Sequence, residues 1–203
     1  MPTADRSRSW EQTAEASEYG TRLLTGPTLQ LRPTTEADLP LLESWWLDPA
    51  VAALQSDAVR PGPPGSAVER FRGWSANDGD AAVGFSVATV DTGELAGHVT
   101  LWGATVRRRS ATLGVLMGPA HRGRGLGREA VGLALRYGFL EMNLHRVQLE
   151  VWAFNERALR CYRAAGFVEE GRRRQVTFHD GRWHDDVLMS VLQPEWTAGT
   201  LDL

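Results

Sequence analysis

The sequence predicts a single α+β domain, with a central mixed, largely antiparallel β-sheet flanked by about four helices. Two observations predict this class. Short stretches in which apolar and polar residues alternate recur along the chain, and three of them follow one another over residues 82–117. Stretches with apolar residues at helical spacing lie before and after them, the longest over residues 126–140. No internal repeat is present, so we expect a flexible N-terminal tail over residues 1–20 and one domain over residues 21–203.

The composition favours a soluble cytoplasmic protein. A chain of 203 residues can bury one substantial core. A formal net charge of −3 predicts no strong attraction to nucleic acid. No apolar run approaches the roughly 20 residues of a membrane span, and the N-terminus lacks the apolar core of a signal peptide. The single cysteine, Cys161, excludes an internal disulfide.

The first part of the chain predicts one strand and two helices. Residues 1–20 are polar and aperiodic, which is typical of a flexible or loosely docked tail. Apolar and polar residues alternate over 28–32, and this predicts the first strand. Apolar residues at helical spacing predict a helix over 39–48, which we expect to end before Pro49. Three prolines and two glycines predict a loop over 51–65, and a second helix should follow it.

The rest of the chain predicts two hairpins, two further helices and a central loop. Residues 82–102 form a hairpin with a turn at 91–94. The next strand leads through a glycine-rich turn into a long apolar helix, and a strand, a capped helix and a closing hairpin come after it. These elements are expected at 110–117, 118–127, 126–140, 145–152, 155–165 and 167–192.

The turn over residues 118–127 predicts an anion site. Glycines let the backbone approach a ligand, and the free N–H groups at the start of a helix attract negative charge. Three arginines add positive charge at the same place. The residues concerned are Arg122, Gly123, Arg124, Gly125, Gly127 and Arg128. The pattern therefore indicates a cofactor that carries a pyrophosphate.

Two common phosphate-binding patterns do not match this turn. A P-loop requires a lysine after its glycines, whereas all 22 basic residues of this chain are arginine. The dinucleotide fingerprint GxGxxG requires a glycine where Arg128 stands. What matches is Arg122-x-x-Gly125-x-Gly127, which resembles the acetyl-CoA pyrophosphate loop of the GNAT superfamily of N-acetyltransferases. On this motif alone, a flexible basic turn that opens a core helix stays an alternative.

A second segment extends the resemblance. It is similar to the strand and helix that follow the cofactor helix in GNAT proteins, and the likeness covers residues 28–192. The resemblance implies a GNAT-type domain in which two strands of the sheet splay apart. Residues 171–185 look like the branch that contains the ribosomal-protein N-terminal acetyltransferases. Family members are monomers or dimers, so a homodimer is one of two expected states. The matching pattern is Asn155-x-x-Ala158-x-x-x-Tyr162-x-x-x-Gly166-Phe167.

The resemblance implies where acetyl-CoA binds. Backbone N–H groups of the basic loop would hold the pyrophosphate, and the edge of the strand that ends at Met117 would pair with the pantetheine arm. A backbone N–H near Met117 would face the thioester oxygen. Asn155 would hydrogen-bond the cofactor, cap its helix, or do both. The expected cofactor-binding residues are Val115, Leu116, Met117, Arg122, Gly123, Arg124, Gly125, Leu126, Gly127, Arg128 and Asn155.

Two residues are candidates for proton transfer. By resemblance, Tyr162 would protonate the leaving thiolate and Glu150 would take a proton from the amine, through a water. Without a catalytic role, Tyr162 would be a core aromatic and Glu150 an outward-facing strand residue. His98 and His145 are weaker candidates for the base. No metal is expected, and Cys161 is not expected to act as a nucleophile.

The resemblance thus implies a direct transfer of acetyl from acetyl-CoA, the co-substrate, to a primary amine. The amine would belong to a peptide N-terminus, an amino acid or an aminated small molecule. The alternative is a non-catalytic module of the same fold that binds acyl-CoA or a partner protein. Nucleic acid and membrane are not expected as partners, because the charge is balanced and no aromatic stripe accompanies the arginines.

Overall fold

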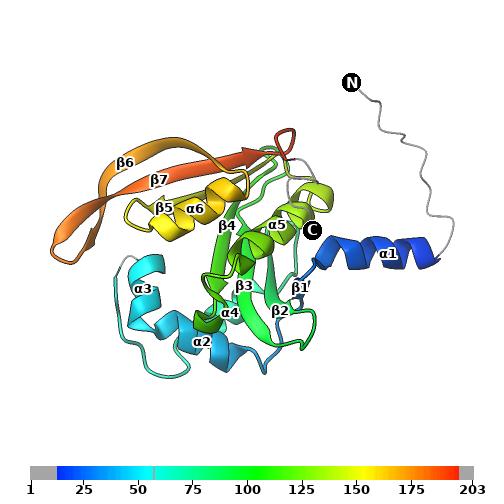
Figure 1. Cartoon of the computed structure of the whole chain (residues 1–203), viewed down its shortest axis with the longest axis horizontal. Coiled ribbons are helices and arrows are strands. Elements are labelled where there is room, and N and C mark those ends of the chain that lie inside the picture. Colours follow the sequence, from blue (N-terminus) through cyan, green and yellow to red (C-terminus); the bar gives the residue numbers. More distant parts are fainter. Residues whose placement is uncertain (1–12, 57, 197–203) are drawn as a thin grey trace.

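The computed structural model describes residues 13–56 and 58–196, which fold around one seven-stranded sheet (Figure 1). Its strands are β1 (Leu29–Arg32), β2 (Val83–Thr89), β3 (Leu95–Trp102), β4 (Ser110–Met117), β5 (Arg146–Trp152), β6 (Val168–His179) and β7 (Arg182–Leu192). The helices of the described residues are α1 (Thr13–Leu24), α2 (Leu39–Leu47), α3 (Pro49–Gln55), α4 (Val68–Trp74), α5 (Leu126–Leu140) and α6 (Glu156–Ala164), with a 3₁₀ turn at Pro119–His121.

The sheet has the order β1-β2-β3-β4-β5-β7-β6. Only β4 and β5 run parallel, and the other neighbouring strands are antiparallel. The parallel pair arises because α5 carries the chain from the end of one strand back to the start of the other, as a parallel connection requires. The predicted mixed, largely antiparallel sheet of an α+β domain is confirmed.

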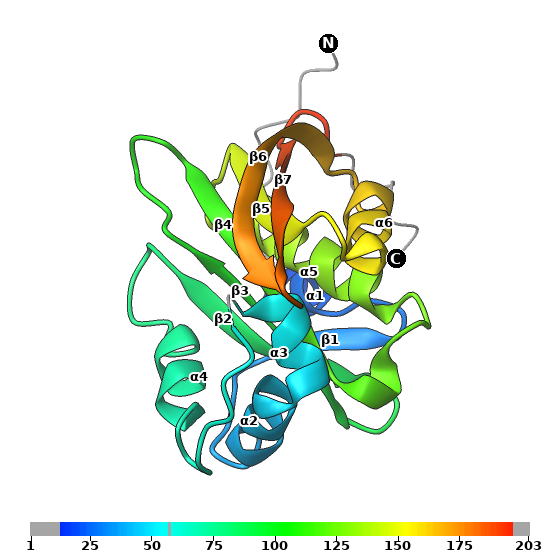
Figure 2. The same ribbon diagram turned by 90° about the vertical axis from the view of Figure 1, so that its left-hand side faces the viewer.

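Helices cover both faces of the sheet and bury two apolar clusters. On one face α5 and α6 pack on the main cluster; nine of the fifteen α5 residues are buried. On the other face α2, α3 and α4 pack with Leu95 and Leu116 in a smaller cluster. Figure 2 shows α2, α3 and α4 together at one end of the sheet, apart from α6. The β6–β7 hairpin extends toward α3 (Figures 1 and 2).

The β4–β5 pair is joined along only part of its length. Its ladder covers three residue pairs, from Ser110↔Arg146 to Thr112↔Gln148. Beyond that point the strands diverge, and the ladder does not join residues 114–117 of β4 to residues 149–152 of β5. We call this region the split. The splayed sheet that the family resemblance implied is therefore present.

Helix α1 differs from the expectation for the N-terminal tail. Residues 1–20 were expected to lack regular structure, yet the chain is helical from Thr13 to Leu24. Residues before 13 lie outside the described part. Only Leu23 of α1 is buried. Polar contacts hold the helix beside α5: Arg136 donates to the Arg22 carbonyl at 2.5 Å, and Tyr19 donates to Glu141. A helix that depends on such tertiary contacts is not marked by the sequence alone.

Helix α3 replaces the first part of the predicted loop over 51–65. Asp48-Pro49 was expected to end a helix, and α2 does end at Leu47, but the same dipeptide starts α3. The Asp48 carboxylate accepts from the Ala50 N–H at 2.9 Å, which is an N-cap. Proline fits the first turn because its missing N–H would have no helical partner there. With α1 and α3, six helices stand where about four were expected.

Among the described residues, no helix is long and apolar enough to cross a membrane.

Candidate active site

The register of β4 determines which backbone groups face the split. The Gly118 N–H donates to the Ala96 carbonyl at 2.9 Å, and Leu116 lies opposite His98 of β3. In an antiparallel pair, alternate residues turn both N–H and C=O to the same neighbour. Leu116 therefore directs its backbone groups to β3. Val115 and Met117 direct theirs the other way, into the split, so these two of the three predicted strand residues present hydrogen-bonding groups there.

The two carbonyls in the split are already occupied by side chains. Gln55 of α3 donates from Nε2 to the Val115 carbonyl at 2.7 Å. Arg122 donates from Nε to the Met117 carbonyl at 2.8 Å. The N–H groups of the same two strand residues have no strand opposite them. The split therefore offers a ligand two donors, which suits the carbonyl oxygens of an amide-rich or thioester chain.

The basic loop, residues 118–125, joins the C-terminal end of β4 to the start of α5. Gly123 and Gly125 have φ values of +74° and +82°, a region that residues with a Cβ avoid. Gly125 is the N-cap of α5, and it offers no side chain to the first N–H groups of the helix. Those groups, from Leu126 and Gly127 onward, stay available to an anion. The predicted strand–loop–helix geometry is confirmed.

Positive charge gathers around this loop from two elements. Burial lowers the pKa of the Arg122 guanidinium, and the nearby Arg157 lowers it further. Arg124 is exposed, and no described residue forms an ion pair with it. Like charges held close together favour binding of an anion. Arg157 lies in the first turn of α6. It was not predicted as a site residue, although its place two residues after Asn155 could have suggested it.

Helix α6 packs against the point where β4 ends and α5 begins. A Cβ at Gly127 would lie 3.5 Å from the Cys161 sulfur and 3.8 Å from Cγ of Met117. Asn155 starts α6 as its N-cap, since its Oδ1 accepts from the Ala158 N–H at 3.2 Å. The capping role expected for Asn155 is therefore present. Tyr162 lies in the same helix and packs against the main apolar cluster.

Tyr162 is half-buried and its ring lies 5.8 Å from that of Phe167. No described residue hydrogen-bonds its hydroxyl. Burial raises the pKa of the Tyr162 phenol well above its usual value, so the hydroxyl keeps its proton at neutral pH. Burial also raises the pKa of the Cys161 thiol. A protonated thiol is a poor nucleophile, which agrees with the expectation that Cys161 does not attack the substrate.

Glu150 lies on the other face of the sheet from Tyr162. Val147, Leu149 and Val151 of β5 point into the α5 cluster, so Glu150 points away from α5 because side chains alternate along a strand. It is exposed and forms an ion pair with Arg173 of β6. Arg173 also contacts Asp186, whose pKa is raised by burial. Sequence reasoning did not find these two partners, since they follow Glu150 by more than twenty residues.

Helix α3 connects the two sides of the split. Beyond Gln55, the Ser56 carbonyl lies 3.1 Å from Nε2 of His179 at the tip of the β6–β7 hairpin. The His179 ring packs against Trp152 at the end of β5, with centroids 5.1 Å apart. The segment Gln55–Ser56 therefore reaches from β4 to the far arm of the sheet. A loop was expected here, so neither contact could be predicted.

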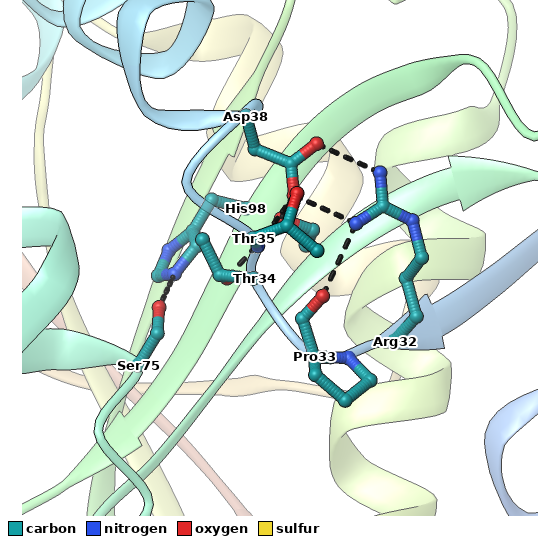
Figure 3. A network of polar contacts seen from close by, with 8 residues as sticks. Arg32, Pro33, Thr34, Thr35, Asp38, Ser75 and His98 are labelled. Carbon is teal, nitrogen blue, oxygen red and sulfur yellow. Dashed lines mark hydrogen bonds and ion pairs between the residues drawn. The ribbon is translucent and has the colours of Figure 1, made fainter.

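His98, the weaker candidate for the base, belongs to a separate polar network (Figure 3). It is buried and its Nε2 lies 2.8 Å from the Ser75 hydroxyl. Burial lowers its pKa to about 4, so the ring is neutral at pH 7. The network centres on Asp38, which accepts from Arg32, Thr35 and Ser86. These contacts tie β1 and β2 to α2. His145 is exposed at the start of β5.

A family comparison agrees with this geometry. The model of the acetyltransferase (GNAT) domain matches residues 28–168, which is more than half of the chain. The chain belongs to the GNAT acetyltransferase family. The family resemblance drawn from the loop and from the segment Asn155–Phe167 is thereby confirmed.

Curated GNAT relatives align with part of the chain. Spermidine N(1)-acetyltransferase of Vibrio cholerae is 36% identical over 102 residues, 50% of this chain and 59% of that protein. The Escherichia coli K12 spermidine N(1)-acetyltransferase is 34% identical over 106 residues, 57% of its length. [Ribosomal protein uS5]-alanine N-acetyltransferase of Escherichia coli K12 is 33% identical over 87 residues, 43% of this chain and 45% of that protein. The alignments thus span less than two thirds of these relatives.

Solved GNAT structures align over most of the chain. Spermidine N-acetyltransferase from Vibrio cholerae in complex with CoA and spermine superimposes with a TM-score of 0.74 at 28% identity. The alignment covers 84% of this chain and 98% of that one. A dodecameric structure of the Vibrio cholerae enzyme gives a TM-score of 0.68 at 27% identity, over 84% of this chain and 96% of that one.

Proposed function

We propose that the protein is an acetyl-CoA-dependent N-acetyltransferase that transfers acetyl directly to a primary amine. The observation that carries the proposal is the split between β4 and β5, into which Val115 and Met117 direct their backbone groups. A glycine-rich loop and the N-terminus of α5 lie at the end of the same strand. An amide-rich chain that ends in a pyrophosphate matches both parts.

Acetyl-CoA would bind with its two ends fixed by different groups. The pyrophosphate would take N–H groups between Arg122 and Arg128, with Arg124 and Arg157 nearby. The pantetheine carbonyls would accept from N–H groups in the split. The Met117 N–H would then stabilise charge on the thioester oxygen. Asn155 would add a hydrogen bond from the side of α6. These assignments rest on the geometry and on the family resemblance.

The chemistry requires two proton transfers on opposite sides of the thioester. The amine nitrogen attacks the acetyl carbon, the carbon–sulfur bond breaks, and the thiolate takes a proton. Tyr162 would supply that proton, because a phenol is protonated at neutral pH and can donate to a thiolate. Glu150 would take the proton of the amine on the opposite face, through a water. Its ion pair with Arg173 fixes the direction in which the carboxylate points.

A polyamine is the acceptor that the comparisons support best. Two of the curated relatives are spermidine N(1)-acetyltransferases, and a solved relative binds CoA and spermine. A protein N-terminus is the second candidate, supported by the uS5-alanine N-acetyltransferase and by the resemblance of residues 171–185 to that branch. A homo-oligomer is the assembly we propose, since one of the solved relatives is a dodecamer.

The test is an acetyl-transfer assay with acetyl-CoA and a panel of spermidine, spermine, single amino acids and an alanine-starting peptide. We expect turnover with spermidine or spermine. Tyr162→Phe should lower kcat by about 10²–10⁴-fold, because it removes the proton donor. Tyr137→Phe is the matched control, since Tyr137 of α5 packs against Phe85 of β2 and is given no role in the proposed chemistry. Glu150→Gln should lower kcat, because it removes the carboxylate proposed to take the proton of the amine.

Two results would contradict the proposal. Turnover that survives Tyr162→Phe at the wild-type rate would remove the assigned acid. Tight binding of acetyl-CoA without transfer to any amine of the panel would favour the alternative, a non-catalytic acyl-CoA-binding module of the same fold.

A further inference from the structure

Gln55 stands at the edge of the split and holds an oxygen with no partner. Its Nε2 donates to the Val115 carbonyl at 2.7 Å, which fixes the plane of the carboxamide. The Oε1 atom of the same group is buried, and no described residue donates to it. A buried acceptor without a partner costs about 1–3 kcal/mol. Native proteins seldom keep such an atom without a partner, so Oε1 is open to a donor from a ligand or from an ordered water.

The position of Gln55 shows which ligand lies within reach. Val115 is two residues from Met117 on the same edge of β4, and both direct their backbone groups into the split. Met117 is the residue proposed to hold the thioester oxygen. With acetyl-CoA bound as proposed, the unpaired oxygen of Gln55 would therefore lie on the side of the thioester. The pyrophosphate would lie beyond Met117, at the loop.

Two groups could donate to Oε1 of Gln55, a pantetheine amide and the acceptor amine, and the face of the sheet on which Gln55 lies favours one of them. A carboxamide oxygen accepts hydrogen bonds only, so its partner must present an N–H or O–H. Pantetheine amides and the acceptor amine both offer N–H groups. Gln55 comes from α3, in the layer opposite α5 and α6, and Glu150 also points to that face. The amine must approach Glu150, whereas the loop that holds the cofactor belongs to α5.

We infer that Gln55 binds and orients the acceptor amine, with Oε1 accepting a hydrogen bond from the amine N–H. This inference rests on the proposed function, because it requires acetyl-CoA in the split. The bond from Nε2 to Val115 sets the direction of Oε1, and the contact of Ser56 with His179 holds the end of α3 against the far arm. Gln55 thus ties amine recognition to the strand that positions the thioester.

The test compares Gln55→Met with the wild type, using the panel amine that the wild type acetylates fastest. Methionine keeps the length of the side chain and removes both polar atoms. The KM for the amine should rise about tenfold or more, because a hydrogen bond to an ammonium group is lost. The KM for acetyl-CoA and the thermal shift with CoA should stay within twofold of wild type. Gln30→Met, the same change on β1 at the edge of the sheet, should alter neither constant.

The outcomes separate this inference from the proposed function. A wild-type enzyme that acetylates no amine overturns the function and the inference together. An active wild type with an unchanged amine KM in Gln55→Met overturns the inference alone. A rise confined to the KM for acetyl-CoA also overturns it, and assigns Oε1 to a pantetheine amide. If Gln55→Met does not fold, the same two constants measured on Gln55→Ala decide the question.

Discussion

At the scale of single residues, the loop glycines face different demands although they belong to one motif. Gly125 has a φ of +82°, and no described atom lies within 4 Å of the point that a Cβ would occupy. Gly127 has helical φ, and a Cβ there would meet Cys161 at 3.5 Å, an ordinary contact. The backbone thus requires a glycine at 125, whereas the space beside residue 127 admits a Cβ.

This difference predicts opposite results for two single substitutions. Gly125→Ala should lower the free energy of unfolding by about 1–2 kcal/mol, because alanine disfavours the left-handed region. It should also weaken acetyl-CoA binding. The free energy of unfolding of Gly127→Ala should stay within about 1 kcal/mol of the wild-type value. Alanine has the higher helix propensity, and this offsets any cost of the new contact with Cys161. Urea denaturation of both variants measures the difference, and equal losses in the two would contradict the assignment.

The sequence supplied many of the residues proposed for the site. The loop arginines and glycines, Asn155 and Tyr162 could be proposed because each belongs to a local pattern with fixed spacing. Gln55, Arg173 and Asp186 were missed because nothing local marks them. Their importance comes from contacts across the fold, such as the Gln55 amide on Val115, sixty residues away.

At the scale of elements, Asp38 joins β1, β2 and the start of α2. Its carboxylate accepts from Arg32, from the backbone and hydroxyl of Thr35, and from Ser86. Burial opposes the charge, but these hydrogen bonds outweigh burial and hold the pKa of Asp38 well below its usual value. The carboxylate is therefore more stable in the folded chain than in the unfolded one.

The lowered pKa of Asp38 predicts a pH-dependent stability. A group whose folded pKa is depressed stabilises the protein at pH values above its unfolded pKa, which is near 4. That stability is lost as the pH falls below this value. Asp38→Asn should cost about 2–4 kcal/mol at pH 7, and the difference from wild type should shrink toward pH 3. Urea denaturation at both pH values checks it; a difference that does not depend on pH would contradict the role of the charge.

Apolar periodicity predicted some elements and missed others. It located the strands β1 to β5 and the helices α2, α5 and α6. Helix α1 buries a single residue, and α3 is seven residues long, starting at a proline. Such short or polar helices depend on tertiary contacts, which a single sequence does not display.

At the scale of the whole molecule, the fold keeps two arms of the sheet apart. One arm ends in β4 and the other begins in β5, and only three residue pairs join them. The splay could be expected from the family resemblance alone, because no local pattern of either strand shows where a ladder ends. Helix α3 reaches across from the first arm to the hairpin of the second. Substrates that enter the split would thus meet residues from both arms.

Binding of acetyl-CoA in the split should raise the midpoint of thermal unfolding, which a melt with and without the cofactor measures. At 100 times its dissociation constant, a ligand stabilises the native state by about 2.7 kcal/mol. For a chain of this size, the midpoint should rise by roughly 5–10 °C. Acetyl-pantetheine, which lacks the pyrophosphate, should give a clearly smaller shift at the same concentration. A well-folded protein whose midpoint moves with neither acetyl-CoA nor free CoA would contradict the account of the split, the loop and the chemistry together.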